Sequence, residues 1–398
     1  MIHVAIDALG WDNERGFGRF TRSLVAALAA RDQGFCYTLL CDRQPERAVP
    51  EGVAVVIAGT RQGMAVAASG AAARAGADML TMSRAAAALG ADLFFFPASY
   101  SFYPILSRVP KLVCIHDTIP ERFPDLIFPT KRNFRLWRMK TWLAKHQARR
   151  ILTVSETSAA DISALLSIPR ERIDVTTEGA EAVFHPIGDA DRLQTALARH
   201  GNAPGDRVLT YIGGFNRHKN VAALIAAMPA ILDAVPEARL VIIGRTTGAR
   251  FWDNVADLQD SARRDARASG RIGFAGELDD AEMAALLNLS DALVMPSLWE
   301  GFGLPALEAM SCGTPVLAAD RGSLPEVVGA AGLYFDPLDR AALAAQAIRL
   351  LTEPGLGAAL REKALARATA FGWDRAASLT EAAFRRTLGP RLPAPSSV

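Results

Sequence analysis

The sequence predicts an α/β protein built from two open parallel sheets, each with helices on both faces. Three observations predict it. The chain has 398 residues, half of them hydrophobic, which is too long for one ordinary core and favours two domains. Short apolar runs alternate with helical patterns along the chain. Many of these runs are apolar without alternation, as expected of strands buried on both sides.

The predicted strands form one set in each half of the chain. In the first half they are His3–Ile6, Tyr37–Cys41, Ala54–Ile57, Leu93–Phe96, Leu112–Ile115 and Ile151–Val154. In the second half they are Val208–Ile212, Leu240–Ile243, Arg271–Phe274, Ala292–Met295, Pro315–Ala318 and Gly332–Phe335. Small ligands of open α/β sheets bind beyond the carboxyl ends of the strands, so we expect the site residues there, in a cleft between the sheets.

Three stretches between these elements have a biased composition. Glycine, proline and aspartate cluster in Phe184–Asp206, which marks the domain connection, and a short helix fits Ala190–His200 within it. Gly63–Leu89 is rich in alanine, the best helix former, and predicts a long helix or a helix pair. The tail Gly389–Val398 is rich in proline and serine and is expected to be frayed.

Composition argues against nucleic acid as a partner. The formal net charge is +2, and aromatic residues make up only 7% of the chain. Neither a strongly basic surface nor a base-stacking surface is therefore expected. The four cysteines form no C-x-x-C pair, which is typical of reduced, buried thiols in a cytosolic protein.

No export signal or membrane span is predicted. Met1–Asp7 lacks a basic region and a cleavage site, and is interpreted as the first strand. The longest apolar stretch, Leu93–Leu106, is too short to cross a bilayer and contains Pro97 and Pro104. We therefore expect a cytoplasmic protein.

The strongest motif is Glu300–Glu308, which follows a predicted strand. Its glycines let the backbone approach a ligand, and the helix expected from Leu304 offers free N–H groups to a phosphate. Glu308 lies about one turn into that helix, where a carboxylate can accept two hydrogen bonds from a ribose diol. Glu300 can hold sugar hydroxyls. The alternative is an ordinary turn with two solvated glutamates.

A second motif follows the predicted strand Val208–Ile212. Gly213-Gly214-Phe215-Asn216 leads into Arg217-His218-Lys219-Asn220, and a helical pattern follows. Cations beside a helix start suit a diphosphate and would neutralise the charge that develops on a leaving phosphate. An exposed basic turn is the alternative.

Two weaker motifs lie in the first half. His116-Asp117 follows the strand Leu112–Ile115 and would orient a donor sugar or an acceptor hydroxyl, unless the histidine is structural. Arg15–Arg19 contains two glycines and looks like a phosphate or acceptor loop, or a flexible turn. It is not a dinucleotide fingerprint, because Thr21 stands where the third glycine is needed.

Two further signals concern metals and membranes. Asp189-Ala190-Asp191 matches a D-x-D pattern but lies in the domain connection, so no metal site is predicted. Lys131–Arg150 carries eight lysines and arginines and no acidic residue, with Phe134, Trp137 and Trp142 among them. Contact with an anionic membrane or lipid-linked acceptor and a solvated basic face both stay open. The cations that form a helical stripe are Lys131, Arg135, Arg138, Lys145 and Arg149.

Together these segments resemble the retaining GT-B glycosyltransferases of family 4, a group that includes bacterial polysaccharide mannosyltransferases. Glu300 and Glu308 have the spacing of the E-x7-E motif of that family. The resemblance runs from about residue 2 to residue 385. It extends to Ser311–Val316, Ser323–Val327, Thr153–Ser158, His116-Asp117 with Pro120, and Gly16–Arg19.

The resemblance implies the GT-B fold, in which the parallel sheets of two Rossmann-like domains face a central cleft. Residues 1–187 would form the acceptor-side domain and residues 205–370 the nucleotide-sugar domain. Residues 371–398 would return a helix near Trp373–Arg386 to the first domain and end in the frayed tail.

The resemblance also implies roles for individual residues. The expected catalytic residues are His116, Asp117, Arg217, Lys219 and Glu300. The expected donor-binding residues are Gly16, Gly18, Gly214, Arg217, Lys219, Gly276, Leu278, Glu300, Gly301, Phe302, Gly303, Leu304 and Glu308. Related sequences read Arg-Lys-Asn directly, whereas His218 intervenes here. The role of the arginine therefore falls to Arg217 or is weakened.

The implied reaction is sugar transfer with retention of configuration, without a metal or other cofactor. The acceptor would be a glycan or a lipid-linked molecule in bacterial surface polysaccharide synthesis. The leaving diphosphate would help to deprotonate the acceptor on the front face, and the protein would supply positioning and charge stabilisation. The protein would work in the cytoplasm, with peripheral contact to the inner face of the membrane if the basic stretch binds lipid.

Several donors and activities stay open. GDP-mannose is the expected donor, and UDP-glucose or another UDP-sugar is the alternative. A sugar-nucleotide epimerase would share the two-lobed architecture but need no acceptor. A non-catalytic nucleotide-sugar-binding subunit would have lost Glu300 or Lys219, and both residues are present.

Overall fold

The computed structural model describes residues 1–14, 16–60, 76–189, 193, 199–201, 203–246 and 254–389. The chain forms two compact units. Unit 1 comprises Met1–Arg122, Phe128–Glu178 and Gly372–Val398, and unit 2 comprises Phe123–Ile127 and Gly179–Phe371. Unit 1 is therefore assembled from three stretches, the last of which comes from the end of the chain.

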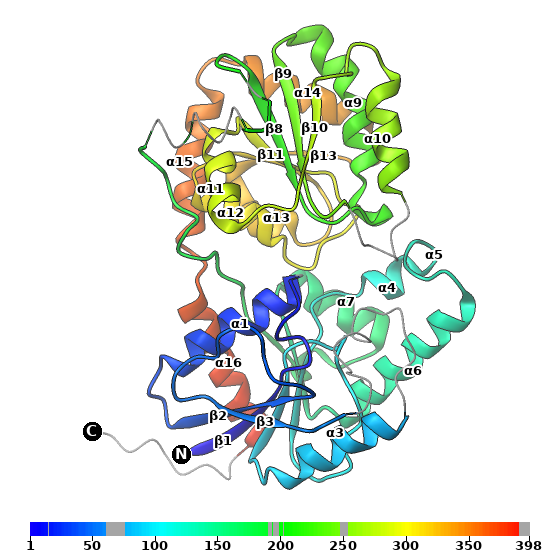
Figure 1. Cartoon of the computed structure of the whole chain (residues 1–398), viewed down its shortest axis with the longest axis vertical. Coiled ribbons are helices and arrows are strands. Elements are labelled where there is room, and N and C mark those ends of the chain that lie inside the picture. Colours follow the sequence, from blue (N-terminus) through cyan, green and yellow to red (C-terminus); the bar gives the residue numbers. More distant parts are fainter. Residues whose placement is uncertain are drawn as a thin grey trace. The chain divides into compact units, whose positions relative to one another are not determined.

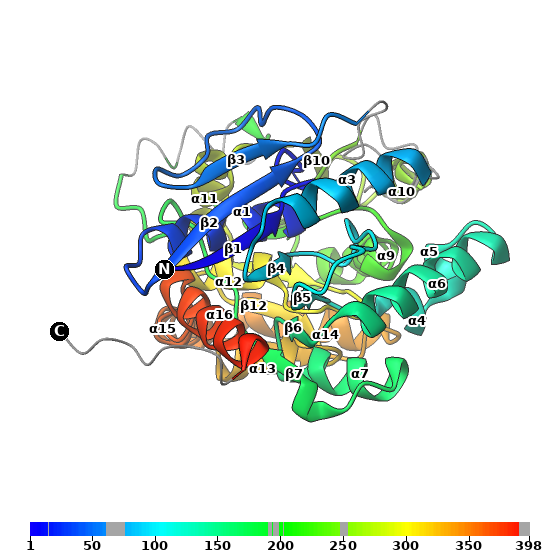
Figure 2. The same ribbon diagram turned by 90° about the horizontal axis from the view of Figure 1, so that it is seen from below.

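Unit 1 contains a seven-stranded parallel sheet in the order β3-β2-β1-β4-β5-β6-β7 (Figures 1 and 2). The predicted strands of the first half are confirmed. The short β7 is not predicted, because Asp174 interrupts its apolar pattern. The strands are β1 (Ile2–Asp7), β2 (Phe35–Cys41), β3 (Ala54–Ile57), β4 (Leu93–Phe96), β5 (Lys111–Cys114), β6 (Arg150–Thr153) and β7 (Ile173–Val175).

Local signals explain where two helices of unit 1 begin. The side-chain oxygen of Thr130 accepts a hydrogen bond from the N–H of Asn133 at the start of α6, and Ser155 caps α7 by accepting from Ser158. Of the alanine-rich Gly63–Leu89, residues 63–75 lie outside the described residues, and the rest is largely α3. The helices are α1 (Gly16–Ala29), α3 (Gly76–Ala88), α4 (Ile119–Arg122), α6 (Lys131–Gln147), α7 (Glu156–Leu166), η1 (Arg170–Arg172) and α16 (Trp373–Leu388).

Helix α16 belongs to the core of unit 1. The ring of Phe384 packs edge-on against Phe95 and Phe35, with ring centroids 5.3 and 5.8 Å apart. The Thr176 hydroxyl after β7 donates a hydrogen bond to the Ala376 carbonyl at 3.1 Å. Figure 2 shows α16 along the sheet of this unit, where it contacts β4, β5, β6 and α1.

Unit 2 contains a six-stranded parallel sheet in the order β10-β9-β8-β11-β12-β13, and the predicted strands of the second half are confirmed. These are β8 (Arg207–Ile212), β9 (Ala238–Ile243), β10 (Ile272–Gly276), β11 (Ala292–Met295), β12 (Val316–Ala319) and β13 (Gly332–Phe335). The helices are α5 (Pro124–Ile127), η2 (Arg217–Lys219), α9 (Val221–Ala234), α10 (Val255–Arg264), α11 (Asp280–Leu289), α12 (Leu304–Ser311), α13 (Leu324–Val328), η3 (Gly329–Ala331), α14 (Arg340–Thr352) and α15 (Leu356–Ala368).

Two predictions in the connection before β8 lie largely outside the described residues. Within Ala190–His200 only residues 193, 199 and 200 are described, and in Asp189-Ala190-Asp191 only Asp189 is. No helix among the described residues has both the length and the apolar character that a membrane crossing requires.

Candidate functional site

The two strongest predicted motifs follow neighbouring strands of unit 2. The chain runs outward from β8 to β9 and β10, and then returns to the other side of β8 as β11. Such a reversal leaves a crevice at the carboxyl ends of the two strands, which is where open α/β sheets bind ligands. Residues 213–220 follow β8 and residues 296–303 follow β11, so both segments border this crevice.

Lys219 and Glu300 meet at this point. The Lys219 ammonium donates to both carboxylate oxygens of Glu300, at 2.7 and 2.8 Å, and the Ser297 hydroxyl donates to one of them at 2.6 Å. Glu300 is 6% exposed. Burial favours its neutral form, but the Lys219 charge and these hydrogen bonds outweigh burial and hold the pKa of Glu300 below its usual value. Glu300 is therefore an ionised hydrogen-bond acceptor.

The backbone around Glu300 is held by the segment after β12. The N–H and the hydroxyl of Ser323 donate to the Glu300 carbonyl at 3.2 and 3.1 Å. Gly322 approaches so closely that a Cβ there would lie 2.7 Å from the same carbonyl oxygen. The Leu298 N–H donates to the His218 carbonyl at 2.8 Å and ties the two site loops together. The motifs in the sequence did not point to Ser297 or Ser323. Each of them nevertheless follows a buried strand, where site residues are expected.

Helix α12 begins as predicted, with Pro305 in its first turn. Gly303 precedes it with φ of +95°, a conformation that favours glycine, and a Cβ there would lie 2.8 Å from Leu324 Cδ2. Phe302 is 4% exposed and packs edge-on against Phe371, with centroids 5.6 Å apart, so its ring fills the core. Glu308 is 2% exposed within α12.

The cations after β8 have different surroundings. Arg217 is exposed, and no carboxylate among the described residues pairs with its guanidinium. His218, the residue between these two cations, is buried. No described residue forms a hydrogen bond with its Nδ1. Burial, assisted by the Lys219 charge, lowers the pKa of His218 to about 4, so its ring is neutral near pH 7.

Three predicted donor-binding residues of unit 2, two glycines and one leucine, lie at the ends of β8 and β10. Gly214 is exposed, and its carbonyl accepts a hydrogen bond from the Tyr211 hydroxyl at 2.6 Å. The Gly276 carbonyl accepts from the Gly244 N–H at 2.8 Å, which joins the ends of β9 and β10. Leu278 is half-buried just beyond.

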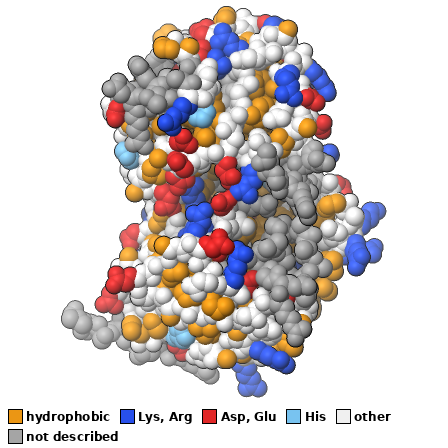
Figure 3. All heavy atoms as spheres, viewed as in Figure 1, with side chains coloured by type: hydrophobic (Ala, Val, Ile, Leu, Met, Phe, Trp, Pro, Cys, Tyr) orange, Lys and Arg blue, Asp and Glu red, His pale blue; other side chains and the backbone are white. Residues whose placement is uncertain are grey.

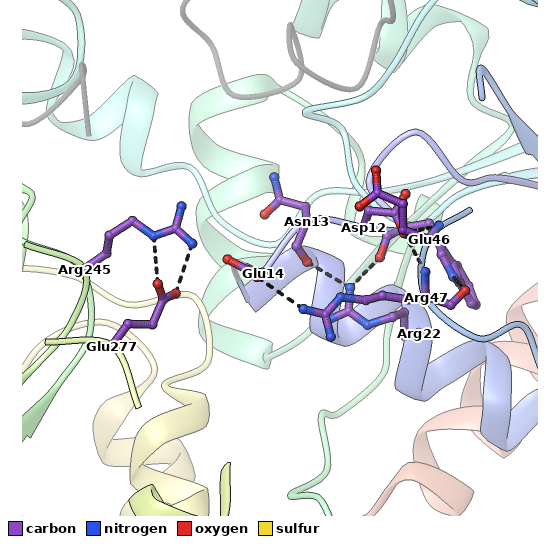
Figure 4. Close-up of polar contacts among 9 residues, drawn as sticks. Asp12, Asn13, Glu14, Arg22, Glu46, Arg47, Arg245 and Glu277 are labelled. Carbon is purple, nitrogen blue, oxygen red and sulfur yellow. Dashed lines mark hydrogen bonds and ion pairs between the residues drawn. The ribbon is translucent and has the colours of Figure 1, made fainter. Parts of the chain in front are cut away.

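An exposed ion pair lies beside Gly276 at the ends of the same two strands. Arg245 follows β9 and Glu277 follows β10, and their side chains approach to 3.0 Å (Figure 4). Both side chains are about half exposed, so the pair contributes little to stability.

In unit 1, His116 lies after β5 with both ring nitrogens directed at protein groups. Its Nε2 donates to the Pro97 carbonyl at 2.9 Å, and its Nδ1 lies 3.6 Å from a Glu178 carboxylate oxygen. Phe20 packs edge-on against the ring. Burial opposes protonation, but Cys114 and Glu178 outweigh it and raise the pKa of His116 well above 6.5. Glu178 was missed because it follows the unpredicted strand β7.

Asp117 has a structural contact of its own. Its carboxylate accepts a hydrogen bond from the Ile119 N–H at 2.9 Å, where α4 begins. Its side chain is half-buried.

The predicted glycine loop of unit 1 is closely packed against the segment after β1. A Cβ on Gly18 would lie 2.1 Å from the Asn13 carbonyl oxygen, whereas a Cβ on Gly16 would meet nothing within 4 Å. The Arg22 guanidinium donates to the same Asn13 carbonyl at 2.8 Å (Figure 4). Arg15 lies outside the described residues. Gly18 is therefore needed for packing, and Gly16 leaves open space beside the start of α1.

Two further observations concern a possible metal site and a cavity. No three histidine, cysteine, aspartate or glutamate side chains converge anywhere in the described ranges. A hollow of about 400 Å³ lies beside Arg207 and Asp291, at the amino ends of β8 and β11. It is at the opposite edge of the sheet from Lys219, and we do not assign it to the site, because open α/β sheets bind ligands at the carboxyl edge.

Two family models match the chain and together cover most of it. The model described as Glycosyltransferase Family 4 matches residues 15–181, and the model described as Glycosyl transferases group 1 matches residues 194–367. The chain is also 34% identical over 242 residues to the O-antigen chain mannosyltransferase B of Escherichia coli. That match covers 60% of this chain and 61% of the relative.

A second relative is longer than this chain. The serotype-specific mannosyltransferase WbdA of Escherichia coli is 29% identical over 297 residues, which is 73% of this chain but 35% of the relative. The chain thus spans less than two thirds of both relatives.

Solved structures match nearly the whole chain in fold. Sucrose-phosphate synthase from Thermosynechococcus elongatus matches with a TM-score of 0.75 at 20% identity, over 97% of this chain and 99% of that one. Anabaena HepE in complex with UDP-glucose matches with a TM-score of 0.73 at 18% identity, over 96% and 99%. At these identities the likeness shows the two-domain fold of parallel sheets.

Proposed function

We propose that this chain, which belongs to the GT-B glycosyltransferases of family 4, transfers a hexosyl group from a nucleotide sugar to a glycan or lipid-linked acceptor. The observation that carries the proposal is the Lys219–Glu300 pair at the reversal point of the unit 2 sheet. It puts a cation and an ionised carboxylate side by side, next to the glycine-preceded start of α12.

The chemistry of this pair suits a nucleotide sugar. The Lys219 ammonium would balance the charge that develops on the leaving diphosphate as the glycosidic bond breaks. Glu300 is ionised and therefore accepts hydrogen bonds from sugar hydroxyls, but it has no proton to give to a leaving group. The diphosphate would itself leave as an anion and take up the acceptor proton, with retention of configuration.

Three further residues have proposed roles. The Leu304 N–H at the start of α12 would bind phosphate, and Glu308 would bind the ribose. The exposed Arg217 would assist at the diphosphate. No metal or other cofactor is part of this proposal.

His116 would act without direct proton transfer. Because its two nitrogens already face Pro97 and Glu178, we propose that it holds the end of β5 in place as a charged, buried group. Asp117 beside it would contact the acceptor or the transferred sugar.

GDP-mannose is the proposed donor. Two relatives of this chain are mannosyltransferases by name, one of them of an O-antigen chain. A UDP-sugar is the second candidate, because HepE, a protein of the same fold, has been solved with UDP-glucose. Synthesis of a bacterial surface polysaccharide is the proposed setting.

Slow donor hydrolysis tests the reaction without a known acceptor. The protein is incubated with GDP-mannose or UDP-glucose, and the released sugar is followed by proton NMR. We expect free sugar whose first-formed anomer has the configuration of the donor, and no epimerised nucleotide sugar. Release of the opposite anomer contradicts retention, and an altered sugar still linked to nucleotide would indicate an epimerase.

A further inference from the structure

Helix α6 packs on unit 1 through one face only. Thr141 and Ala144 of this face are buried. The Trp137 indole N–H donates to Glu121 at 2.7 Å, and the Lys140 ammonium donates to the Tyr100 carbonyl at 3.1 Å. These contacts fix the rotation of the helix, and hence which residues lie on its outer side.

The outer side exposes large apolar side chains. Leu136 is 49% exposed, Met139 56% and Trp142 56%. Their spacing of three residues places them in one row along the helix. No described part of unit 1 covers this row. Burying these apolar side chains would be favourable, because it would remove them from water. A grouped apolar row of this kind marks an interaction surface.

Exposed cations lie beside this row. Arg132, Arg135 and Arg138 are exposed, and within the described ranges none of them pairs with a carboxylate. No acidic residue occurs between Lys131 and Arg150. Figure 3 shows lysine and arginine side chains projecting at the margin where α6 lies in Figure 1. Elsewhere exposed arginines do have acidic neighbours, as Arg267 does with Asp233 at 2.8 Å.

We propose that the outer face of α6 docks unit 1 on an anionic lipid surface. Leu136, Met139 and Trp142 would enter the headgroup region, and the neighbouring arginines would bind lipid phosphates. An apolar row flanked by unpaired cations is the composition that holds a helix in the plane of a membrane interface. The neighbouring arginine side chains are long and have several rotatable bonds, which suits a fluid surface rather than one fixed partner. This inference is independent of the proposed transfer reaction.

Vesicle co-sedimentation of the full chain tests the proposal without any donor. The probes are vesicles of phosphatidylcholine alone, and of phosphatidylglycerol and phosphatidylcholine in equal parts. We expect the protein to sediment with the anionic vesicles, to be released by salt, and to stay in solution with phosphatidylcholine.

The variants separate the apolar row from the cations. Trp142→Ser and Met139→Ser should each lower the affinity for anionic vesicles at least about tenfold. Arg135→Ala and Arg138→Ala should each lower it about fivefold. Leu338→Ser, at a side chain of unit 2 that is 78% exposed, and Arg264→Ala on α10 are the matched controls and should leave it unchanged. Thermal melting checks that each variant is folded.

Three outcomes would overturn the proposal. The wild-type chain stays in solution with anionic vesicles, or the α6 variants bind as the controls do. In the third, the α6 variants change the sedimentation coefficient of the protein without vesicles, which would make the row a self-association surface. Because no donor is present, none of these outcomes bears on the transferase proposal.

Discussion

Lys219 and Glu300 form a mostly buried ion pair, so losing either charge affects stability as well as chemistry. In Lys219→Met the Glu300 carboxylate stays buried without its partner, which costs about 3–5 kcal/mol of unfolding free energy. Donor turnover should fall about 100-fold or more, because charge on the leaving group is no longer balanced. Urea unfolding and the NMR hydrolysis assay measure the two effects.

A double variant separates these effects. Lys219→Met combined with Glu300→Gln removes both charges, so the unfolding free energy should recover in part while turnover stays low. Lys363→Met, at an exposed lysine of α15, is the control and should match the wild-type protein. A double variant with wild-type turnover would count against a role for the pair in catalysis.

His218 predicts a pH dependence of stability. Its pKa falls from 6.5 to about 4 on folding, so the unfolded chain binds the proton more strongly. The corresponding stability is complete above pH 6.5 and is lost as the pH falls towards 4, by at most about 3 kcal/mol. His218→Asn should lose less stability over that range in urea titrations. Equal losses in both proteins would show that His218 is not the titrating group.

The sequence predicts residue types at the site better than their orientations. It places Lys219 and Glu300 after strands, but the order of the strands is what makes them neighbours, and no periodicity encodes that order. Phe302 was expected to contact the donor, yet its ring packs against Phe371 in the core. An aromatic ring in a glycine-rich loop can either contact a ligand or pack into the core, and the surrounding side chains decide which of the two occurs.

At the scale of single elements, the start of α1 offers a matched pair of glycines. Gly18→Ala would place a Cβ 2.1 Å from the Asn13 carbonyl oxygen, and we expect a loss of about 3 kcal/mol of stability as loop and helix separate. Gly16→Ala meets open space and should stay within about 0.5 kcal/mol of the wild-type chain. Denaturant unfolding of the two variants measures the difference, and equal effects would contradict the described loop packing.

The contact between α4 and α6 carries a second pH dependence. Burial raises the pKa of Glu121 to about 7, although the Trp137 indole donates to its carboxylate. The neutral form is thus favoured on folding, and its stability is complete below pH 4.5 and lost as the pH rises through 7. Glu121→Gln should remove this loss, of the order of 3 kcal/mol at most, from a urea series between pH 4.5 and pH 8. If the stability of Glu121→Gln changed with pH as that of the wild-type protein does, Glu121 would not be the titrating group.

At the scale of the whole molecule, strand positions follow from apolar runs and are predicted well. The exception is β7, whose three residues include the buried Asp174. That carboxylate is held by Arg150 and Arg386, at 2.5 and 2.7 Å, and Arg386 lies more than 200 residues later in the chain. Pairing over such a separation leaves no local pattern, so a strand that depends on it is hard to predict.

The central claim is that unit 2 binds a sugar nucleotide through the Lys219–Glu300 site. Thermal-shift measurements with GDP-mannose, GDP and UDP-glucose on the wild-type chain, Glu308→Ala and Lys363→Met test it most directly. GDP-mannose at 100 times its Kd should stabilise the wild-type chain and Lys363→Met by about 2.7 kcal/mol, and Glu308→Ala by clearly less. A wild-type melting temperature that no sugar nucleotide shifts would contradict the claim.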